Sequence, residues 1–111
     1  IRYADVVLMA AEAANELGQS GKAANYVNMI RNRAGLANTT AADQVTLRAA
    51  IKQERRIEFA MEFERFYDLV RWGDAPAVLG AKGYTDKNKY FPIPQEAIDK
   101  SQGVLVQNPN Y

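Results

Sequence analysis

Residues 44–72 read QVTLRAAIKQERRIEFAMEFERFYDLVRW, and this stretch decides the fold class. It contains no glycine or proline, and its apolar residues recur at helical spacing, which predicts a long helix. Asp43 is the natural N-cap of this helix, and Gly73 and Pro76 follow its end. Because a helix over 43–73 is long against the usual roughly 8–20 residues, we expect it to run either continuously or with a kink near Phe63.

The segment before this helix predicts a helical hairpin. Residues 1–17 and 21–33 each have an amphipathic helical pattern, and Gly18 and Gly35 follow the two patterns. The pair over residues 1–35 resembles one tetratricopeptide (TPR) helix pair. We expect two inward faces, formed by Tyr3, Val6, Val7, Ala10, Ala13, Ala14 and Leu17 in the first helix and by Ala23, Tyr26, Val27 and Ile30 in the second.

The segment after the long helix predicts an irregular tail. Residues 74–111 contain scattered glycines and prolines and no periodic apolar pattern, so we expect loop and tail there. Residues 90–94 must be extended, because each proline disfavours helix in the residue before it. A short helical turn is expected over residues 95–98. The predicted fold is all-α over a single unit, residues 1–111.

Composition excludes several classes of protein. The 111 residues carry 14 Lys and Arg against 13 Asp and Glu, so the charge balance gives no reason to expect nucleic acid as a partner. His and Cys are absent, which excludes a Ser-His-Asp triad, a cysteine nucleophile and His- or thiolate-based metal sites. We therefore expect no cofactor and no metal. No apolar run approaches the ~20 residues needed to span a bilayer.

Three glutamates, Glu54, Glu58 and Glu62, lie four residues apart on one stripe of the predicted long helix. Like charges at this spacing repel, so the stripe needs cations nearby. A carboxylate-bridged metal site usually recruits His, and a glycosidase pair needs two carboxylates facing each other across a cleft. Both alternatives fit poorly, and we expect ion pairs with arginines. The available arginines are Arg31, Arg33, Arg55, Arg56 and Arg65.

A second charged set, Arg65, Asp68 and Arg71, follows at a spacing of three residues. Asp68 can accept hydrogen bonds from either arginine. We expect Arg55 or Arg56 to be substantially buried, paired with a carboxylate of the stripe or with Asp68. The residues assigned to structural ion pairs are Glu54, Arg55, Arg56, Glu58, Glu62, Arg65, Asp68 and Arg71.

Three aromatic residues, Trp72, Tyr84 and Tyr90, are the candidates for contact with a sugar ring. Aromatic faces stack on sugars, but an aromatic at a helix end or beside a loop more often packs into the core or anchors the loop. No residue is assigned a catalytic role.

Five segments together resemble the SusD/RagB family in order and spacing across the chain. They are IRYADV at 1–6, NMIRNRAGL at 28–36, ERRIE at 54–58 with FYDLVRWG at 66–73, YFPIP at 90–94 and QNPNY at 107–111. The family often has glycine where Phe63 and Asn110 stand, and the first departure favours a continuous helix through residue 63.

The resemblance implies the C-terminal portion of a nutrient-binding lipoprotein on the outer membrane of Bacteroidota. Such proteins bind a glycan or another nutrient, work with a SusC-like TonB-dependent transporter and are not enzymes. It implies contact with the membrane only through an N-terminal lipid anchor, which this chain lacks; the chain opens at Ile1, and we expect it to be a piece of a longer protein. Most ligand-contacting aromatics would lie upstream, so the isolated chain is expected not to bind a glycan usefully. The alternative is a generic TPR-like protein-interaction domain.

Overall fold

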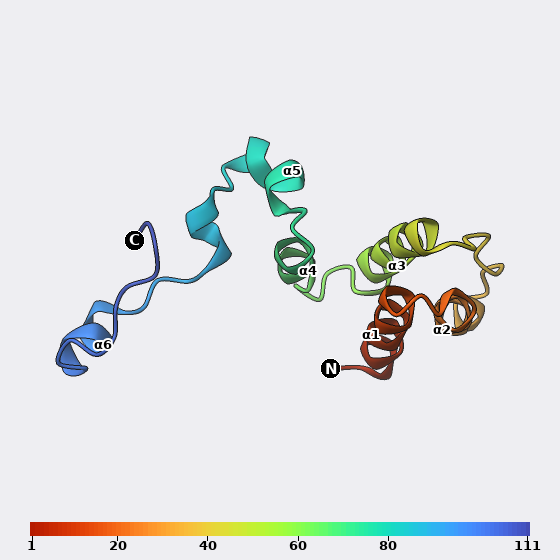
Figure 1. Ribbon diagram of the computed structural model, residues 1–111, viewed down its shortest axis with the longest axis horizontal. Coiled ribbons are helices and arrows are strands. Elements are labelled where there is room, and N and C mark those ends of the chain that lie inside the picture. The colour runs from red at the N-terminus through yellow and green to blue at the C-terminus, as the bar shows by residue number, and fades with distance from the viewer. The chain divides into compact units, whose positions relative to one another are not determined.

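The computed structural model describes residues 1–111 and contains helices and no strands, which confirms the all-α prediction (Figure 1). The chain divides into two compact units, Ile1–Phe63 and Glu64–Tyr111. The first unit contains α1 (Tyr3–Glu16), α2 (Ser20–Arg33) and α3 (Gln44–Glu58). The second contains α4 (Arg65–Arg71), α5 (Ala75–Leu79), the 3₁₀ helices η1 (Gly80–Lys82) and η2 (Asp86–Lys89), and α6 (Gln95–Lys100). None of these helices combines the length and apolarity that crossing a bilayer requires.

Local sequence sets the ends of the first three helices. Gly18 and Gly35 follow α1 and α2 with φ angles of 72° and 74°, a left-handed conformation that glycine adopts without a steric penalty. Asp43 caps α3: its side chain accepts from the backbone N–H groups of Val45 and Thr46, and the Thr46 hydroxyl accepts from the Asp43 N–H. The predicted cap at Asp43 is therefore confirmed.

The core of the first unit lies where α1 packs against both α2 and α3 (Figure 1). Leu8, Val27, Leu47 and Ile51 are fully buried there. The inward face predicted for the second helix is largely confirmed. That predicted for the first helix is confirmed at Val7 and Ala14 and was wrong at Tyr3, Val6 and Leu17, which are exposed. The buried residues of α1 are Ala4, Val7, Leu8, Ala11, Ala14 and Asn15. The buried face differs from the predicted one because α1 packs against two neighbouring helices at once. A single amphipathic stripe describes packing against one partner only.

The long helix predicted over 43–73 is two helices, so the continuous interpretation was wrong. Helix α3 ends at Glu58, and α4 starts at Arg65. Met61 and Phe63 between them have φ angles of 69° and 64°, so the expected break near Phe63 lies in this turn. The physical reason is length: α1 and α2 have 14 residues each, so a helix continuing past Phe59 in this unit would leave its apolar side chains without a partner.

The second unit is built from short helices and a pinned tail. Residues 74–111 were predicted as loop and tail, but they contain α5, η1, η2 and α6; only the helical turn that became α6 was predicted. Two side chains near the C-terminus hold the extended residues 90–94 in place. The Gln107 amide accepts from the Ile93 N–H at 2.8 Å and donates to the Ile93 carbonyl at 2.9 Å, and Asn108 Nδ2 donates to the Phe91 carbonyl.

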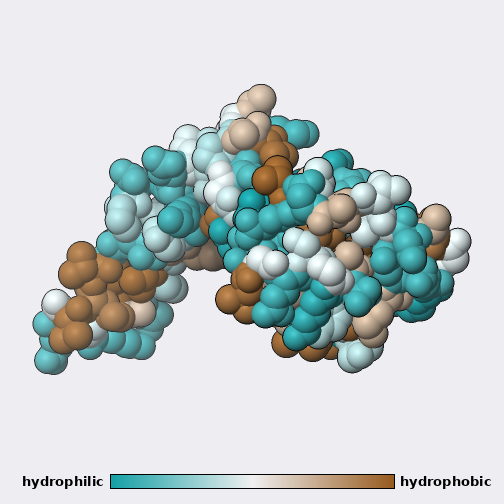
Figure 2. All heavy atoms as spheres, turned by 45° about the vertical axis from the view of Figure 1, so that its right-hand side comes forward, coloured by the Kyte–Doolittle hydropathy of each residue, from teal (hydrophilic) through white to brown (hydrophobic).

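The tail of the second unit exposes apolar side chains. Val104 and Val106 are 82% and 80% exposed. Figure 2 shows hydrophobic surface gathered over the end of the chain that carries α6. This unit therefore buries far less of its apolar surface than the first one does.

Candidate functional site

Each glutamate of the stripe is neutralised by an arginine from α2 or from the start of α1. Glu54 Oε2 accepts from Arg31 Nη1 at 3.0 Å. Glu58 accepts from Arg2 Nη1 at 2.9 Å and also from Arg33 Nη2. Glu62 accepts from Arg2 Nη2 at 2.7 Å and from Arg2 Nε at 2.9 Å. The stripe thus joins α3 and the following turn to both other helices of the unit.

The pKa shifts match this assignment. The Arg33 guanidinium, and after it that of Arg2, holds the pKa of Glu58 below its ordinary value. Glu62 first, and then Glu58, raises the pKa of Arg2. A glycosidase acid needs the opposite, a carboxyl whose pKa is raised so that it keeps its proton. Glu58 is therefore held ionised by its two arginine partners.

Arg55 is the buried arginine of α3, with 4% of its surface exposed. Its Nη1 donates to Asp5 Oδ1 at 2.8 Å, and its guanidinium lies 4.9 Å from the centre of the Phe59 ring. Arg56 is exposed. Sequence reasoning missed Asp5 as a partner because nothing in the sequence aligns the first turn of α1 with the last turn of α3.

The second charged set lies on α4. Arg71 Nε donates to Asp68 Oδ1 at 2.9 Å, and Asp68 is buried. Arg65 is half-buried, and no ion pair is described for it.

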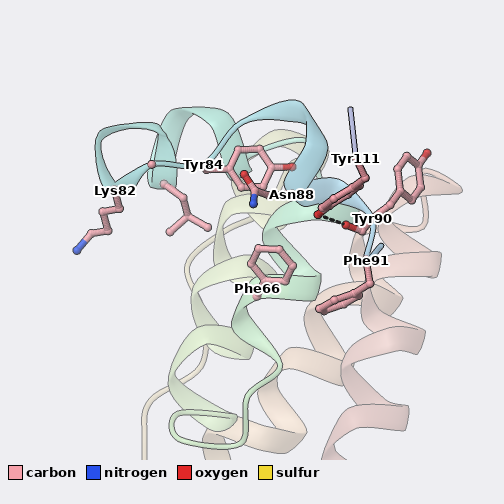
Figure 3. A pocket seen from close by; sticks show the side chains of 9 residues that line it. Phe66, Lys82, Tyr84, Asn88, Tyr90, Phe91 and Tyr111 are labelled. Carbon is pink, nitrogen blue, oxygen red and sulfur yellow. Dashed lines mark hydrogen bonds between the residues drawn. The ribbon is translucent and has the colours of Figure 1, made fainter. Parts of the chain in front are cut away.

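Aromatic side chains of the second unit line a cavity of about 320 Å³ (Figure 3). Its lining residues are Phe66, Leu79, Lys82, Gly83, Tyr84, Asn88, Tyr90, Phe91 and Tyr111. The Phe66 and Tyr84 rings are 6.3 Å apart and tilted by 58°. Figure 3 shows the rings of Phe91 and Tyr111 to the right of Phe66 and Tyr84, while the Lys82 side chain extends outward at the left. The cavity therefore offers several ring faces and edges within one unit.

Backbone and side-chain hydrogen bonds position these rings. Gly83, with a φ angle of 94°, turns the chain between η1 and Tyr84. The Asn88 Oδ1 accepts from both the N–H and the hydroxyl of Thr85, which fixes the start of η2. The Tyr111 hydroxyl donates to the Tyr90 carbonyl at 2.9 Å, the contact drawn in Figure 3. Tyr111 thus closes one wall of the cavity.

A second cavity of about 410 Å³ adjoins the first and shares Phe66, Tyr90 and Phe91 with it. The remaining lining residues are Tyr67, Val70, Arg71, Lys89 and Asn108. Two of them are cationic, and neither cavity is lined by an aspartate or a glutamate.

The three aromatic candidates fall in different places. Tyr84 lines the first cavity with its ring close to Phe66. Tyr90 lines both cavities, but Figure 3 shows its ring turned away from those of Phe66 and Phe91. Trp72 lines neither, and the Arg71 guanidinium lies 4.7 Å from its ring centre. A role for any of them in ligand contact stays a prediction.

Sequence reasoning did not select Phe66, Phe91 or Tyr111 as site residues. Phe66 lies within the long helix predicted over 43–73, and the other two lie in segments without a periodic pattern. Prolines lie close to Phe91 and Tyr111 in the sequence, which predicts that both segments are rigid. It does not predict that the two segments contact each other in the fold. No group of three or more Asp or Glu residues is placed to hold a metal ion.

Comparison with known proteins gives consistent matches. A SusD-like protein from Formosa agariphila, P2, is 35% identical over an alignment that covers all of this chain and 25% of that protein. A laminarin-binding SusD-like protein of known structure is 42% identical, with a TM-score of 0.83 over all of this chain and 22% of that one. Surface glycan-binding protein A from Bacteroides thetaiotaomicron is 37% identical, with a TM-score of 0.75 over 99% of this chain and 24% of that one.

The chain thus spans about a quarter of the length of the proteins it matches. The model of the SusD family matches residues 1–88, which include the helical hairpin, the glutamate stripe and most of the first cavity's lining residues. The chain therefore belongs to the SusD family.

Proposed function

We propose that this chain is the scaffold part of a cell-surface lipoprotein that binds a glycan or another nutrient and passes it to a SusC-like TonB-dependent transporter. The observation that carries the proposal is the match of residues 1–88 to the SusD family. Two relatives, a laminarin-binding protein and a surface glycan-binding protein, support a carbohydrate as the nutrient. The membrane anchor and the transporter contact belong to the intact protein in this proposal.

The ion-pair network supports a binding role rather than a hydrolytic one. Every carboxylate of the stripe is engaged by at least one arginine, and Glu58 is held ionised by two. The pKa of Glu58 is lowered by Arg33 and Arg2, the opposite of what a general acid needs. The generic protein-interaction alternative gains no support, because it does not account for the pinned extended segment 90–94.

Affinity purification from outer membranes tests the transporter partnership. The intact protein, carrying a tag, is purified in mild detergent, and we expect a TonB-dependent transporter to co-purify with it. The same protein is titrated calorimetrically with oligosaccharides and incubated with them while reducing ends are counted. We expect saturable binding without new reducing ends. Absence of the transporter would overturn the partnership, absence of any saccharide binding would overturn the glycan assignment, and new reducing ends would overturn the non-enzymatic role.

A further inference from the structure

The two adjoining cavities of the second unit combine aromatic rings with uncompensated positive charge. We propose that they form a saccharide subsite selective for anionic sugars, meaning residues that carry a carboxylate or a sulfate. This inference rests on the proposed function and deepens it, because it names a location and a substrate class.

The aromatic component supplies the stacking surface. Sugar rings present apolar C–H faces, and proteins bind them with aromatic side chains plus a few oriented polar groups. Phe66 and Tyr84 lie 6.3 Å apart at the first cavity, and Tyr67 joins Phe66 at the second. The cavities, of about 320 and 410 Å³, are in the range of small-ligand sites.

The charge component sets the selectivity. Lys89 lines the second cavity, with its Nζ 5.6 Å from the Tyr90 ring centre. Lys87 Nζ lies 5.7 Å from the ring centre of Tyr111, a lining residue of the first cavity. Lys82 lines the first cavity at its rim, where its flexible side chain extends outward (Figure 3).

These lysines lack carboxylate partners. No salt bridge is described for Lys82, Lys87 or Lys89, whereas Lys100 on α6 pairs with Glu96. Asp86 is the only acidic residue between Gly80 and Pro94, and it lines neither cavity. An arriving carboxylate or sulfate would therefore meet an excess of positive charge beside the rings, where it replaces water around the ammonium groups.

A polar group in the wall is oriented for a sugar hydroxyl. Asn88 lines the first cavity, and its Oδ1 is occupied by the two hydrogen bonds from Thr85. Its Nδ2 is thereby fixed in direction, and no acceptor for it is described within the chain. This donor beside the Tyr84 ring is suited to a hydroxyl or carboxylate oxygen of a stacked sugar.

The test uses the intact protein and three oligosaccharides of equal length: an oligogalacturonate, a sulfated galactan and a neutral laminari-oligosaccharide. Calorimetric titration should give an affinity for at least one anionic oligosaccharide that is about tenfold weaker after Lys87→Gln with Lys89→Gln, and also after Tyr84→Ala. The matched control is Lys22→Gln with Lys100→Gln, which removes the same charge from exposed lysines outside both cavities and should leave the affinity unchanged. Raising the salt concentration should weaken anionic binding but not neutral binding.

Each outcome separates this inference from the proposed function. If anionic oligosaccharides bind but the cavity variants and the control bind alike, the subsite is overturned while glycan binding stands. If only the neutral oligosaccharide binds, the charge selectivity is overturned. If no saccharide binds, both the inference and the glycan assignment fail. If Tyr84 in the intact protein resists a tyrosine-specific reagent that modifies it in residues 1–111 alone, a flanking segment fills the cavity and the subsite is overturned.

Discussion

Each of the two units of this chain is stabilised internally by a different kind of interaction. In Ile1–Phe63, three helices bury a shared apolar core and are joined by arginine–carboxylate pairs between helices. In Glu64–Tyr111, Leu69 and Ala75 are the buried apolar residues, and much of the order comes from side chains that hydrogen-bond to distant backbone groups. The first unit is a packed helical core, and the second places aromatic rings beside its cavities.

The comparison gives a physical reason to expect ligand contact in the second unit, as proposed above. The first unit has a cavity of about 420 Å³ between α1 and α2, but Tyr3 is the one aromatic residue in its lining. Its two arginines, Arg2 and Arg33, are already paired with glutamates. A pinned loop keeps aromatic rings fixed without burying them, as Tyr84, Phe91 and Tyr111 show.

The largest effect is expected in the first unit, at the buried pair Arg55–Asp5. Arg55→Ala should lower the free energy of unfolding by about 3–5 kcal/mol, because it leaves Asp5 without its guanidinium in a largely buried site. Chemical denaturation followed by circular dichroism measures the loss. The matched control is Arg56→Ala, which removes the same side chain from the exposed neighbouring position. Equal effects for the two variants would show that burial of Arg55 is not what stabilises the unit.

In the second unit we expect the largest loss of local stability on substitution of Gln107. Its side-chain amide bonds both the N–H and the carbonyl of Ile93, as a neighbouring strand would. Gln107→Ala removes both hydrogen bonds to Ile93 and one to the Asn108 N–H, which should cost about 1–3 kcal/mol locally. The measurement is amide hydrogen exchange at Ile93, which should become much faster while α3 stays protected. Gln53→Ala, at an exposed helical position, serves as the control. If the Ile93 amide stayed protected in Gln107→Ala, the tail would be ordered by something other than this amide.

Acid should weaken the first unit before the second. The pKa values of Glu16, Asp43 and Glu58, all in the first unit, are lowered in the fold by Arg48, by Thr46 and by Arg33 respectively. A lowered pKa contributes stability that is fully present above the unfolded value of about 4.5 for glutamate and is lost as pH falls through the folded pKa. The denaturant concentration at the unfolding midpoint of the first unit should therefore decrease once the pH is lowered below about 4.5. Glu58→Gln should flatten the dependence, and Glu64→Gln, at an exposed position of the second unit, should leave it unchanged.

Sequence predicted the first unit better than the second, for a physical reason. Helical periodicity and caps report local geometry, so α2, the Asp43 cap and the end of α1 at Gly18 were predicted from neighbouring residues. Contacts between elements carry no such periodicity. Asp5 meets Arg55 across 50 residues, and Tyr111 meets Tyr90 across 21, and neither pairing is encoded locally. Tyr84 was found as a site candidate by residue type alone, but its neighbours Phe66 and Tyr111 were not.

The smallest expected effect concerns the turn where the two units meet in sequence. Phe63 is 89% exposed and has a φ angle of 64°, a left-handed conformation that costs a non-glycine residue about 1–2 kcal/mol. Phe63→Gly should remove this cost, but glycine also gives the unfolded chain more conformational freedom, which offsets part of the gain. We expect a net stabilisation of less than about 1 kcal/mol. Phe63→Ala separates the two contributions, because it removes the ring but keeps a Cβ in the strained conformation. Thermal unfolding of the three proteins measures their order of stability. We expect the highest unfolding temperature for Phe63→Gly, above those of Phe63→Ala and the unsubstituted protein. A lower stability for both variants would mean that the Phe63 ring is buried against another part of the intact protein, and the turn would then be held by packing rather than by backbone conformation.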